Sequence, residues 1–116
     1  MGIVVIVDDE EAICGELLDC VEGIGLSGRS FTNPLLGLAF LNETNEDVDV
    51  VLVDVMMPEM GGETFIKNAK NVTGTKTRYY LMSGVSKCDM DPISSEAGVL
   101  FLHKPLSFAG IKKILK

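Results

Sequence analysis

An apolar run that ends in a carboxylate lies near the middle of the chain: Val48-Asp49-Val50-Val51-Leu52-Val53-Asp54. Every residue from Val50 to Val53 is apolar, which predicts a strand that is covered on both faces, as in the centre of a parallel sheet. Asp54 then stands where this buried strand reaches solvent. Its position makes Asp54 a candidate nucleophile.

Two other strand-like runs also end in charged residues. Residues 3–7 lead into Asp8 and Asp9, and residues 99–102 lead through His103 into Lys104. The carboxyl ends of the strands in an open parallel α/β sheet share one edge, which is where such folds hold their sites. We therefore expect three carboxylates and one ammonium group to meet at that edge.

Apolar runs of strand length alternate with helical periodicity along the whole chain, which predicts an α/β fold, a doubly wound parallel sheet of the (βα)5 type with helices on both faces. The expected strands cover residues 3–7, 26–31, 50–53, 78–82 and 99–102. The expected helices cover residues 10–22, 34–41, 63–71, 91–98 and a last segment from about residue 107. Asn33 reads as the N-cap of the second helix, with Pro34 at its first position.

The spacing of apolar residues also predicts which side of each helix is buried. The expected buried stripes are Ile13, Leu17, Val21 and Ile24 in the first helix, Phe65, Ala69 and Val72 in the third, and Phe108, Ile111 and Leu115 in the last. A group of methionines is expected to pack around Asp54: Met56, Met57, Met60 and Met82.

Composition limits the function classes. A chain of 116 residues with 47% hydrophobic and 23% charged residues fits one soluble globular domain, here residues 1–116. The net charge of -7 argues against direct nucleic acid binding and suits a protein that binds a cation. No run approaches the ~20 apolar residues that span a bilayer. The absence of a signal peptide pattern and the three cysteines without a zinc-like pair predict a reducing, cytoplasmic location.

Asp8, Asp9 and Asp54 would repel one another at one edge unless a cation neutralised them. Mg²⁺ prefers oxygen ligands and keeps several waters, so two carboxylates and a backbone carbonyl are enough protein ligands. A phosphoryl group can then fill a remaining position, with its charge shared between Mg²⁺ and Lys104. Ser83, at the end of the fourth expected strand, could donate a hydrogen bond to that group.

Each of these residues alone has a simpler interpretation. Residues 8–11 could cap a helix and complement its dipole, Asp54 could be a turn residue, and Lys104 could be a surface lysine. His103, the single histidine, is read as a loop residue beside the site. Their joint occurrence at successive strand ends favours a site.

Four motifs together resemble the receiver domain of two-component response regulators, in order and over essentially the whole chain: Val7-Asp8-Asp9-Glu10, residues 52–62 (Leu-Val-Asp-Val-Met-Met-Pro-Glu-Met-Gly-Gly), Leu81-Met82-Ser83-Gly84 and Phe101-Leu102-His103-Lys104-Pro105. The resemblance implies a flavodoxin-like strand order, 2-1-3-4-5. It also implies a signalling switch rather than an enzyme that acts on an external substrate.

The resemblance assigns roles to individual residues. It implies that Asp54 is the phosphoacceptor, that Asp9 is a direct Mg²⁺ ligand, and that Asp8 supports the ion partly through water. The backbone carbonyl of Met56 would complete the protein ligands. Ser83 would be the switch hydroxyl.

Two further roles and the partners follow from the same resemblance. Lys104 would form an ion pair with the phosphoryl group, and Phe101 would move inward behind Ser83. The donor would be a histidine kinase or a histidine phosphotransfer protein, and the signal would leave through the fourth helix, fifth strand and fifth helix to an output domain or target protein. Gly61, where the family usually has Asp or Asn, and Pro92 in the fourth helix depart from the pattern.

Rival classes differ in the chemistry they need. A pseudo-receiver would use the same fold as a protein-binding module without phosphorylation, but its acidic site need not be intact as it is here. A haloacid-dehalogenase-like phosphohydrolase needs a second Asp two residues after the nucleophile, where this chain has Met56. A flavodoxin-like flavin binder needs backbone donors in the first loop, which is anionic here.

Met56 and Val85 cannot orient a hydrolytic water, which predicts a long-lived phosphorylated form.

Overall fold

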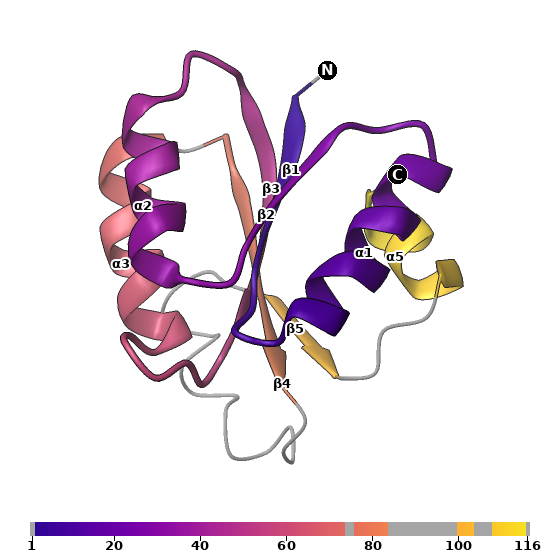
Figure 1. Cartoon of the computed structure of the whole chain (residues 1–116). Helices are drawn as coiled ribbons and strands as arrows, with labels where there is room; N and C mark the ends of the chain where they lie inside the picture. The colour runs from indigo at the N-terminus through magenta and orange to yellow at the C-terminus, as the bar shows by residue number, and fades with distance from the viewer. Residues whose placement is uncertain (1, 74–75, 84–99, 104–107, 116) are drawn as a thin grey trace.

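The computed structural model describes residues 2–73, 76–83, 100–103 and 108–115, the side chains of 100–103 excepted. Five parallel strands form one sheet in the order β2-β1-β3-β4-β5, which confirms the predicted topology (Figure 1). Their bounds are Ile3–Val7 for β1, Gly28–Phe31 for β2, Val48–Asp54 for β3, Arg78–Ser83 for β4 and Leu100–His103 for β5.

Helices cover both faces of this sheet (Figure 1). Their bounds are Glu11–Gly23 for α1, Pro34–Glu43 for α2, Gly62–Thr73 for α3 and Phe108–Leu115 for α5. The pair α2 and α3 lies on one face, and the pair α1 and α5 lies on the other (Figure 1). The helix expected over residues 91–98 lies outside the described residues. Where the structure is described, no helix is both long and apolar enough to cross a membrane.

The central strands are buried on both sides, as the run from Val50 to Val53 predicts. Alternate residues of a strand point to opposite faces. Val51 and Val53 accordingly join the core under α2 and α3, while Val50 and Leu52 join the core under α1 and α5. One short chain therefore builds two apolar layers, one on each face of the sheet.

Local signals start and stop the helices. The Asn33 side chain accepts a hydrogen bond of 2.8 Å from the backbone N–H of Leu35, and Pro34 begins α2, as predicted. Gly25 has a φ of 97°, a left-handed conformation that lets the chain leave α1 with little strain. The end of α5 is tied to the sheet, because Arg78 donates a hydrogen bond of 3.1 Å to the carbonyl of Ile114.

A small polar network ties the end of α3 to β4. The hydroxyl groups of Thr73 and Tyr79 are hydrogen-bonded, and the Lys70 ammonium lies 5.8 Å from the centre of the Tyr79 ring. Burial raises the pKa of Tyr79, so its phenol stays protonated and able to donate. The last turn of α3 is thereby fixed against the sheet.

Three predicted burials are wrong. Phe108 is 49% exposed and Val72 is 44% exposed, because each lies at a helix end, where the stripe has passed beyond the sheet. Met56 is 72% exposed and does not pack around the site, although Met57 and Met82 do pack in the core. In α1 the buried stripe is Cys14, Leu17 and Val21, while Ile13 and Ile24 are only partly buried.

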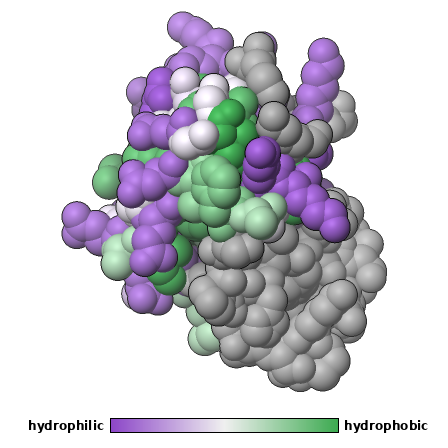
Figure 2. Space-filling model, turned by 90° about the vertical axis from the view of Figure 1, so that its right-hand side faces the viewer, coloured by the Kyte–Doolittle hydropathy of each residue, from purple (hydrophilic) through white to green (hydrophobic). Residues whose placement is uncertain are grey.

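Phe108 keeps a packing role at the surface. A Cβ atom added to Gly23 would lie 3.3 Å from its ring, so the ring sits over the last residue of α1. Figure 2 views this side of the molecule and shows hydrophobic residues gathered in the middle of the face, with hydrophilic ones above them and to their left. The absence of a side chain at Gly23 lets α5 approach α1 closely.

Candidate functional site

Three strands bring the predicted site residues to one edge of the sheet. Asp8 and Asp9 directly follow β1, Asp54 is the last residue of β3, and Ser83 is the last residue of β4. The parallel register pairs Val7 with Val53 and Asp54 with Met82. The strand ends are therefore level, and their polar residues share one edge.

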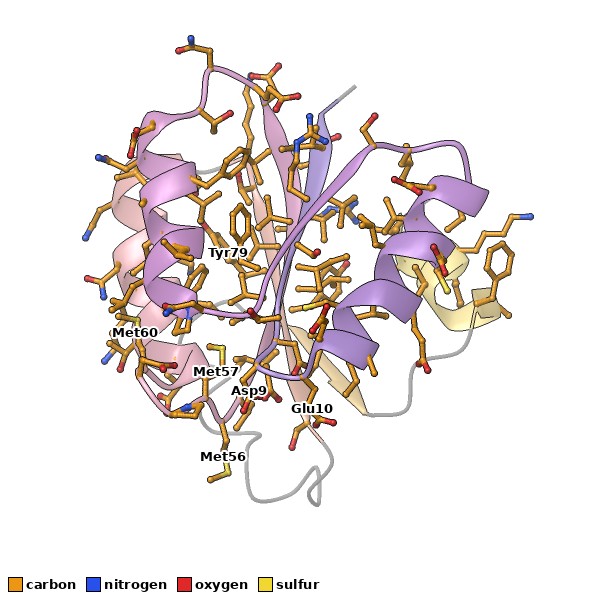
Figure 3. The ribbon with its side chains drawn as sticks, viewed as in Figure 1. Asp9, Glu10, Met56, Met57, Met60 and Tyr79 are labelled. Atoms are coloured by element: carbon orange, nitrogen blue, oxygen red, sulfur yellow. The ribbon has the colours of Figure 1, made fainter. Side chains whose placement is uncertain are left out.

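The carboxylates form a tight cluster. One oxygen from each of Asp8, Asp9 and Asp54 lies within 4.8 Å of the others. Asp8 is fully buried, Asp54 is 8% exposed, and Asp9 is exposed. Figure 3 shows Asp9 and Glu10 at the lower edge of the sheet, in the loop that leads into α1. The sequence-based prediction that these three residues meet is confirmed.

Backbone and side-chain hydrogen bonds hold Asp8. Its N–H donates to the carbonyl of Phe31 at 3.1 Å, which joins it to the end of β2. One oxygen of its carboxylate accepts from the N–H of Glu10 at 2.9 Å. The thiol of Cys14 donates to its backbone carbonyl at 3.3 Å. The loop after β1 is thus bonded to both the sheet and α1.

The segment after Asp54 is held as firmly. The N–H of Val55 donates to the carbonyl of Met82 at 3.0 Å, and the N–H of Gly62 donates to the carbonyl of Val55 at 2.8 Å. A Cβ atom at Gly62 would lie 2.5 Å from the carbonyl oxygen of Asp54 and 2.7 Å from Leu81, so only glycine fits. The start of α3 therefore packs directly against the backbone of Asp54.

Gly61 has a different environment from its neighbour. A Cβ atom there would have its nearest contact at 3.6 Å, with the carbonyl oxygen of Val55, and its φ is not positive. The backbone at Gly61, where the family usually has Asp or Asn, therefore has room for a side chain. The loop shape does not depend on glycine at position 61.

Cys14 is a buried neighbour of the cluster that sequence analysis did not assign to the site. Burial raises the pKa of its thiol to about 11, and the nearby charge of Asp8 adds to the effect. The thiol therefore stays protonated at neutral pH and can act as a donor. The signal in the sequence was its spacing, since Cys14, Leu17 and Val21 form one helical stripe that begins six residues after Asp8.

The methionines after Asp54 divide into two groups. Figure 3 shows Met56 pointing away from the protein and Met57 pointing toward its interior, with Met60 farther along the loop. The exposed fraction is 72% for Met56 and 7% for Met57. The side chain of Met56, two residues after Asp54, therefore lies largely in solvent.

The remaining predicted residues are described only in part. Ser83 is 3% exposed at the end of β4, and its backbone pairs with His103. Phe101 pairs with Leu81 in the sheet, but its side chain is outside the described part of the structure. Lys104 and Val85 also lie outside the described residues. The structure thus brings together Asp8, Asp9, Asp54 and the strand that ends in Ser83.

The donor set fits a hard divalent cation. Mg²⁺ binds oxygen at about 2.0–2.1 Å, so ligand oxygens around one ion lie up to about 4 Å apart. The 4.8 Å limit on the cluster needs a closure of less than about 1 Å to reach that geometry. The N-termini of α1 and α3 lie at the same edge, where helix dipoles favour negative charge.

Comparison with known proteins identifies the family of this chain. The family model for the response regulator receiver domain matches residues 4–116. The response regulator protein TodT of Pseudomonas putida is 30% identical over 106 residues, which cover 90% of this chain and 45% of TodT. The sensor kinase CckA of Brucella abortus is 25% identical, covering 97% of this chain and 12% of the kinase. This chain thus spans less than half the length of these two relatives.

Solved structures agree on the fold. The chemotaxis protein CheY4 of Vibrio cholerae superposes with a TM-score of 0.89 at 22% sequence identity, covering 99% of this chain and 96% of CheY4. The matched family model covers nearly all of the present sequence, and the sheet order and the acidic edge agree with it. The chain therefore belongs to the response regulator receiver domains of two-component signalling systems.

Proposed function

We propose that this domain accepts a phosphoryl group on the carboxylate of Asp54 and acts as a phosphorylation-controlled switch. The cluster of three carboxylate oxygens within 4.8 Å carries this proposal. Asp54 closes a strand that is buried from Val50 onward, and its backbone is held by close packing against Gly62 and by the hydrogen bonds that follow it. A carboxylate held in this way can act as a nucleophile. Because two other carboxylates lie beside it, a bound cation is needed to offset their repulsion of an incoming anionic phosphoryl group.

Asp9, Asp8, Asp54 and the backbone carbonyl of Met56 are the proposed protein ligands of a Mg²⁺ ion, with Asp8 acting partly through water. When bound, the ion neutralises charge on the carboxylates and on the incoming phosphoryl group. Asp8 is buried and Asp9 is exposed, so their carboxylates are suited to different distances from such an ion. The family membership supports this assignment.

The transfer itself needs few protein groups. A carboxylate oxygen of Asp54 forms a bond to phosphorus while the bond from phosphorus to the donor imidazole nitrogen breaks. The electron pair remains on that nitrogen. Hydrolysis later adds water to the phosphorus, releases inorganic phosphate and restores the carboxylate. Positioning and electrostatic stabilisation account for most catalysis in reactions of this kind.

The switch is assigned to residues beyond the carboxylates. Ser83 is proposed to donate its hydroxyl to the phosphoryl group, Lys104 to form an ion pair with it, and Phe101 to move inward behind Ser83. Ser83 ends the strand beside β3 and is nearly buried, which supports its role. The proposed output surface is formed by the fourth helix, expected over residues 91–98, together with β5 and α5.

The phosphoryl donor is proposed to be a phosphohistidine on a histidine kinase or a phosphotransfer protein, and the receiver of the signal an output domain or a separate target protein. Relatives that include a sensor kinase and a response regulator support both kinds of partner. Residues 1–116 are proposed to form one receiver domain. Cys14 and Cys20 are free thiols, which suits a cytoplasmic, reducing compartment.

The direct test is labelling of the purified protein with a small phosphodonor such as acetyl phosphate in the presence of Mg²⁺. Intact-mass analysis is expected to show one added phosphoryl group, and omission of Mg²⁺ is expected to reduce labelling at least about 100-fold. Asp54→Asn is expected to abolish labelling. Asp49→Asn is a matched control, because Asp49 lies on the same strand but at the opposite end.

Labelling of Asp54→Asn to the level of the wild type would show that another residue is the acceptor. Absence of labelling and of beryllofluoride binding in the folded wild type would contradict the proposal. That second result would instead favour a pseudo-receiver, which binds its partners without phosphorylation.

A further inference from the structure

The buried Cys14 thiol lies directly beneath the loop that carries the metal-binding carboxylates. Cys14 is 3% exposed and sits in the first turns of α1, six residues after Asp8. Its sulfur lies 3.3 Å from the carbonyl oxygen of Asp8 and 3.7 Å from that of Phe31. The thiol therefore lies where the ends of β1 and β2 meet α1.

These contacts complete a ring of hydrogen bonds around Asp8. The N–H of Asp8 is bonded to Phe31, and its carboxylate accepts from the N–H of Glu10. The N–H of Cys14 in turn donates to the carbonyl of Glu10 at 3.1 Å. Cys14 thus contacts the residue on each side of Asp9, using its thiol for Asp8 and its backbone for Glu10.

We propose that Cys14 is a positioning residue for the acidic cluster: its thiol fixes the backbone carbonyl of Asp8 and thereby holds the Asp8 carboxylate at the distance and angle that a divalent cation needs. This inference rests on the proposed function, because it deepens the assignment of Asp8 as a Mg²⁺ ligand. Groups that orient metal ligands typically change metal affinity 10- to 100-fold when they are removed. A thiol is a weak donor, so the effect here is expected at or below the lower limit of that range.

Burial gives the thiol its influence. Asp8 and Cys14 are both shielded from water, and a hydrogen bond in such surroundings is electrostatically stronger than one in solvent. The carbonyl of Asp8 would lose a partner if the thiol were removed, and the loop between β1 and α1 would gain freedom. An apolar side chain at position 14 could fill the same volume, but it could not donate this hydrogen bond.

The test compares Cys14→Ala, Cys14→Val and Cys14→Ser. Alanine removes both the donor and most of the volume, valine fills the volume without a donor, and serine keeps a donor that can bond to Asp8. Cys20→Ala is the matched control, because Cys20 lies on the same helix, partly buried, but six residues farther from the loop. All four variants are used as the whole chain, and thermal unfolding checks that each is folded.

The first readout is the Mg²⁺ dissociation constant, measured by titration of backbone amide chemical shifts. Cys14→Ala and Cys14→Val are expected to weaken Mg²⁺ binding about 3- to 10-fold. Cys14→Ser is expected to stay within about 2-fold of the wild type, and Cys20→Ala is expected to match it. A purely structural role would instead lower the unfolding temperature with no change in affinity, and serine would give no rescue.

The second readout needs no metal and separates the two proposals. The N–H of Glu10 is bonded to the Asp8 carboxylate, so its hydrogen exchange reports on the position of Asp8. Cys14→Ala and Cys14→Val are expected to speed this exchange several-fold, and Cys14→Ser is expected to slow it again. Wild-type Mg²⁺ affinity and unchanged Glu10 exchange in the folded Cys14→Val variant would overturn the inference. Failure of the wild type to bind Mg²⁺ would overturn the proposed metal site, while Glu10 exchange would still decide whether Cys14 positions Asp8.

Discussion

The two ends of the sheet are both acidic, but they use their carboxylates differently. At the amino end, Asp49 accepts a hydrogen bond of 2.9 Å from the N–H of Gly2, and Glu46 forms a salt bridge of 3.1 Å with Arg29. At the carboxyl end, Asp8, Asp9 and Asp54 lie within 4.8 Å of one another. Acidic groups at the amino end join parts of the chain together, whereas those at the carboxyl end concentrate charge in one place.

The direction of the chain explains this difference. Each strand of the sheet is parallel to its neighbours, so α1, α2 and α3 all begin at the carboxyl end. Helix N-termini favour negative charge, whereas the amino end of the sheet receives the opposite ends of the helices. The carboxyl end can therefore tolerate a charge cluster that the amino end would not, and that tolerance is what a cation site requires.

The largest expected effect concerns the packing beneath the carboxyl end. Gly62→Ala would place a methyl carbon 2.5 Å from the Asp54 carbonyl oxygen, so the backbone must shift. We expect the free energy of unfolding to fall by about 2–3 kcal/mol, measured by urea unfolding. Gly61→Ala is the matched control, and we expect it to leave stability unchanged or to raise it by up to about 1 kcal/mol. Equal losses in both variants would mean that α3 does not pack on Asp54 as described.

The next prediction is that neutralising an aspartate changes the free energy of unfolding in opposite directions at the two ends of the sheet. Asp54→Asn removes one of three adjacent charges, so in Mg²⁺-free buffer we expect it to raise the free energy of unfolding by about 1–2 kcal/mol. Asp49→Asn is expected to lower it by up to about 1 kcal/mol, because its carboxylate accepts a hydrogen bond. Chemical denaturation of both variants measures this. A loss of stability in both would show that charge repulsion does not dominate at the carboxyl end.

Added Mg²⁺ is expected to separate the Asp54→Asn and Asp49→Asn variants further. A ligand present at ten times its dissociation constant stabilises the protein by about 1.4 kcal/mol. We expect the wild type and Asp49→Asn to show this gain and Asp54→Asn to show much less. An equal gain in Asp54→Asn would mean that Asp54 is not a ligand.

A smaller effect concerns the lifetime of the phosphorylated form. Met56 follows Asp54 by two residues and has no group that can orient a water molecule in line with the phosphorus. Met56→Asn combined with Val85→Glu is expected to speed the decay of the label about 3- to 10-fold at fixed Mg²⁺. The high exposure of Met56 means that it covers little, so its lack of polar groups matters more than its bulk. Unchanged decay in the folded variant would show that these side chains do not limit hydrolysis.

The smallest effect belongs to the amino end. Arg29 and Glu46 form a salt bridge whose side chains are 41% and 44% exposed. Solvent screens such pairs, so Arg29→Ala is expected to change the free energy of unfolding by less than about 0.5 kcal/mol, with no change in labelling of Asp54. A loss above 1 kcal/mol would show that this end contributes more to stability than its exposed contacts indicate.

Much of the fold was predictable from the sequence because its signals are local. The apolar run before Asp54 predicted a strand buried on both faces, and Asn33 with Pro34 predicted the start of α2. Placing Asp8, Asp9 and Asp54 at one edge needed only the rule that parallel strands end together. The prediction was wrong at Val72 and Phe108, because periodicity along a helix does not show where the sheet beneath it ends.

The sequence by itself determined the order of the elements, the alternation that buries the strands, and the residue types that meet at the carboxyl end. Only the tertiary structure decided which small residues support them: Gly62 against Asp54 and the Cys14 thiol under Asp8. The physical reason is that strand and helix patterns depend on neighbours in the sequence, whereas these contacts join residues brought together only when α1 and α3 pack on the sheet. Their distances are set by that packing, and the sequence shows only that a small side chain stands at each position.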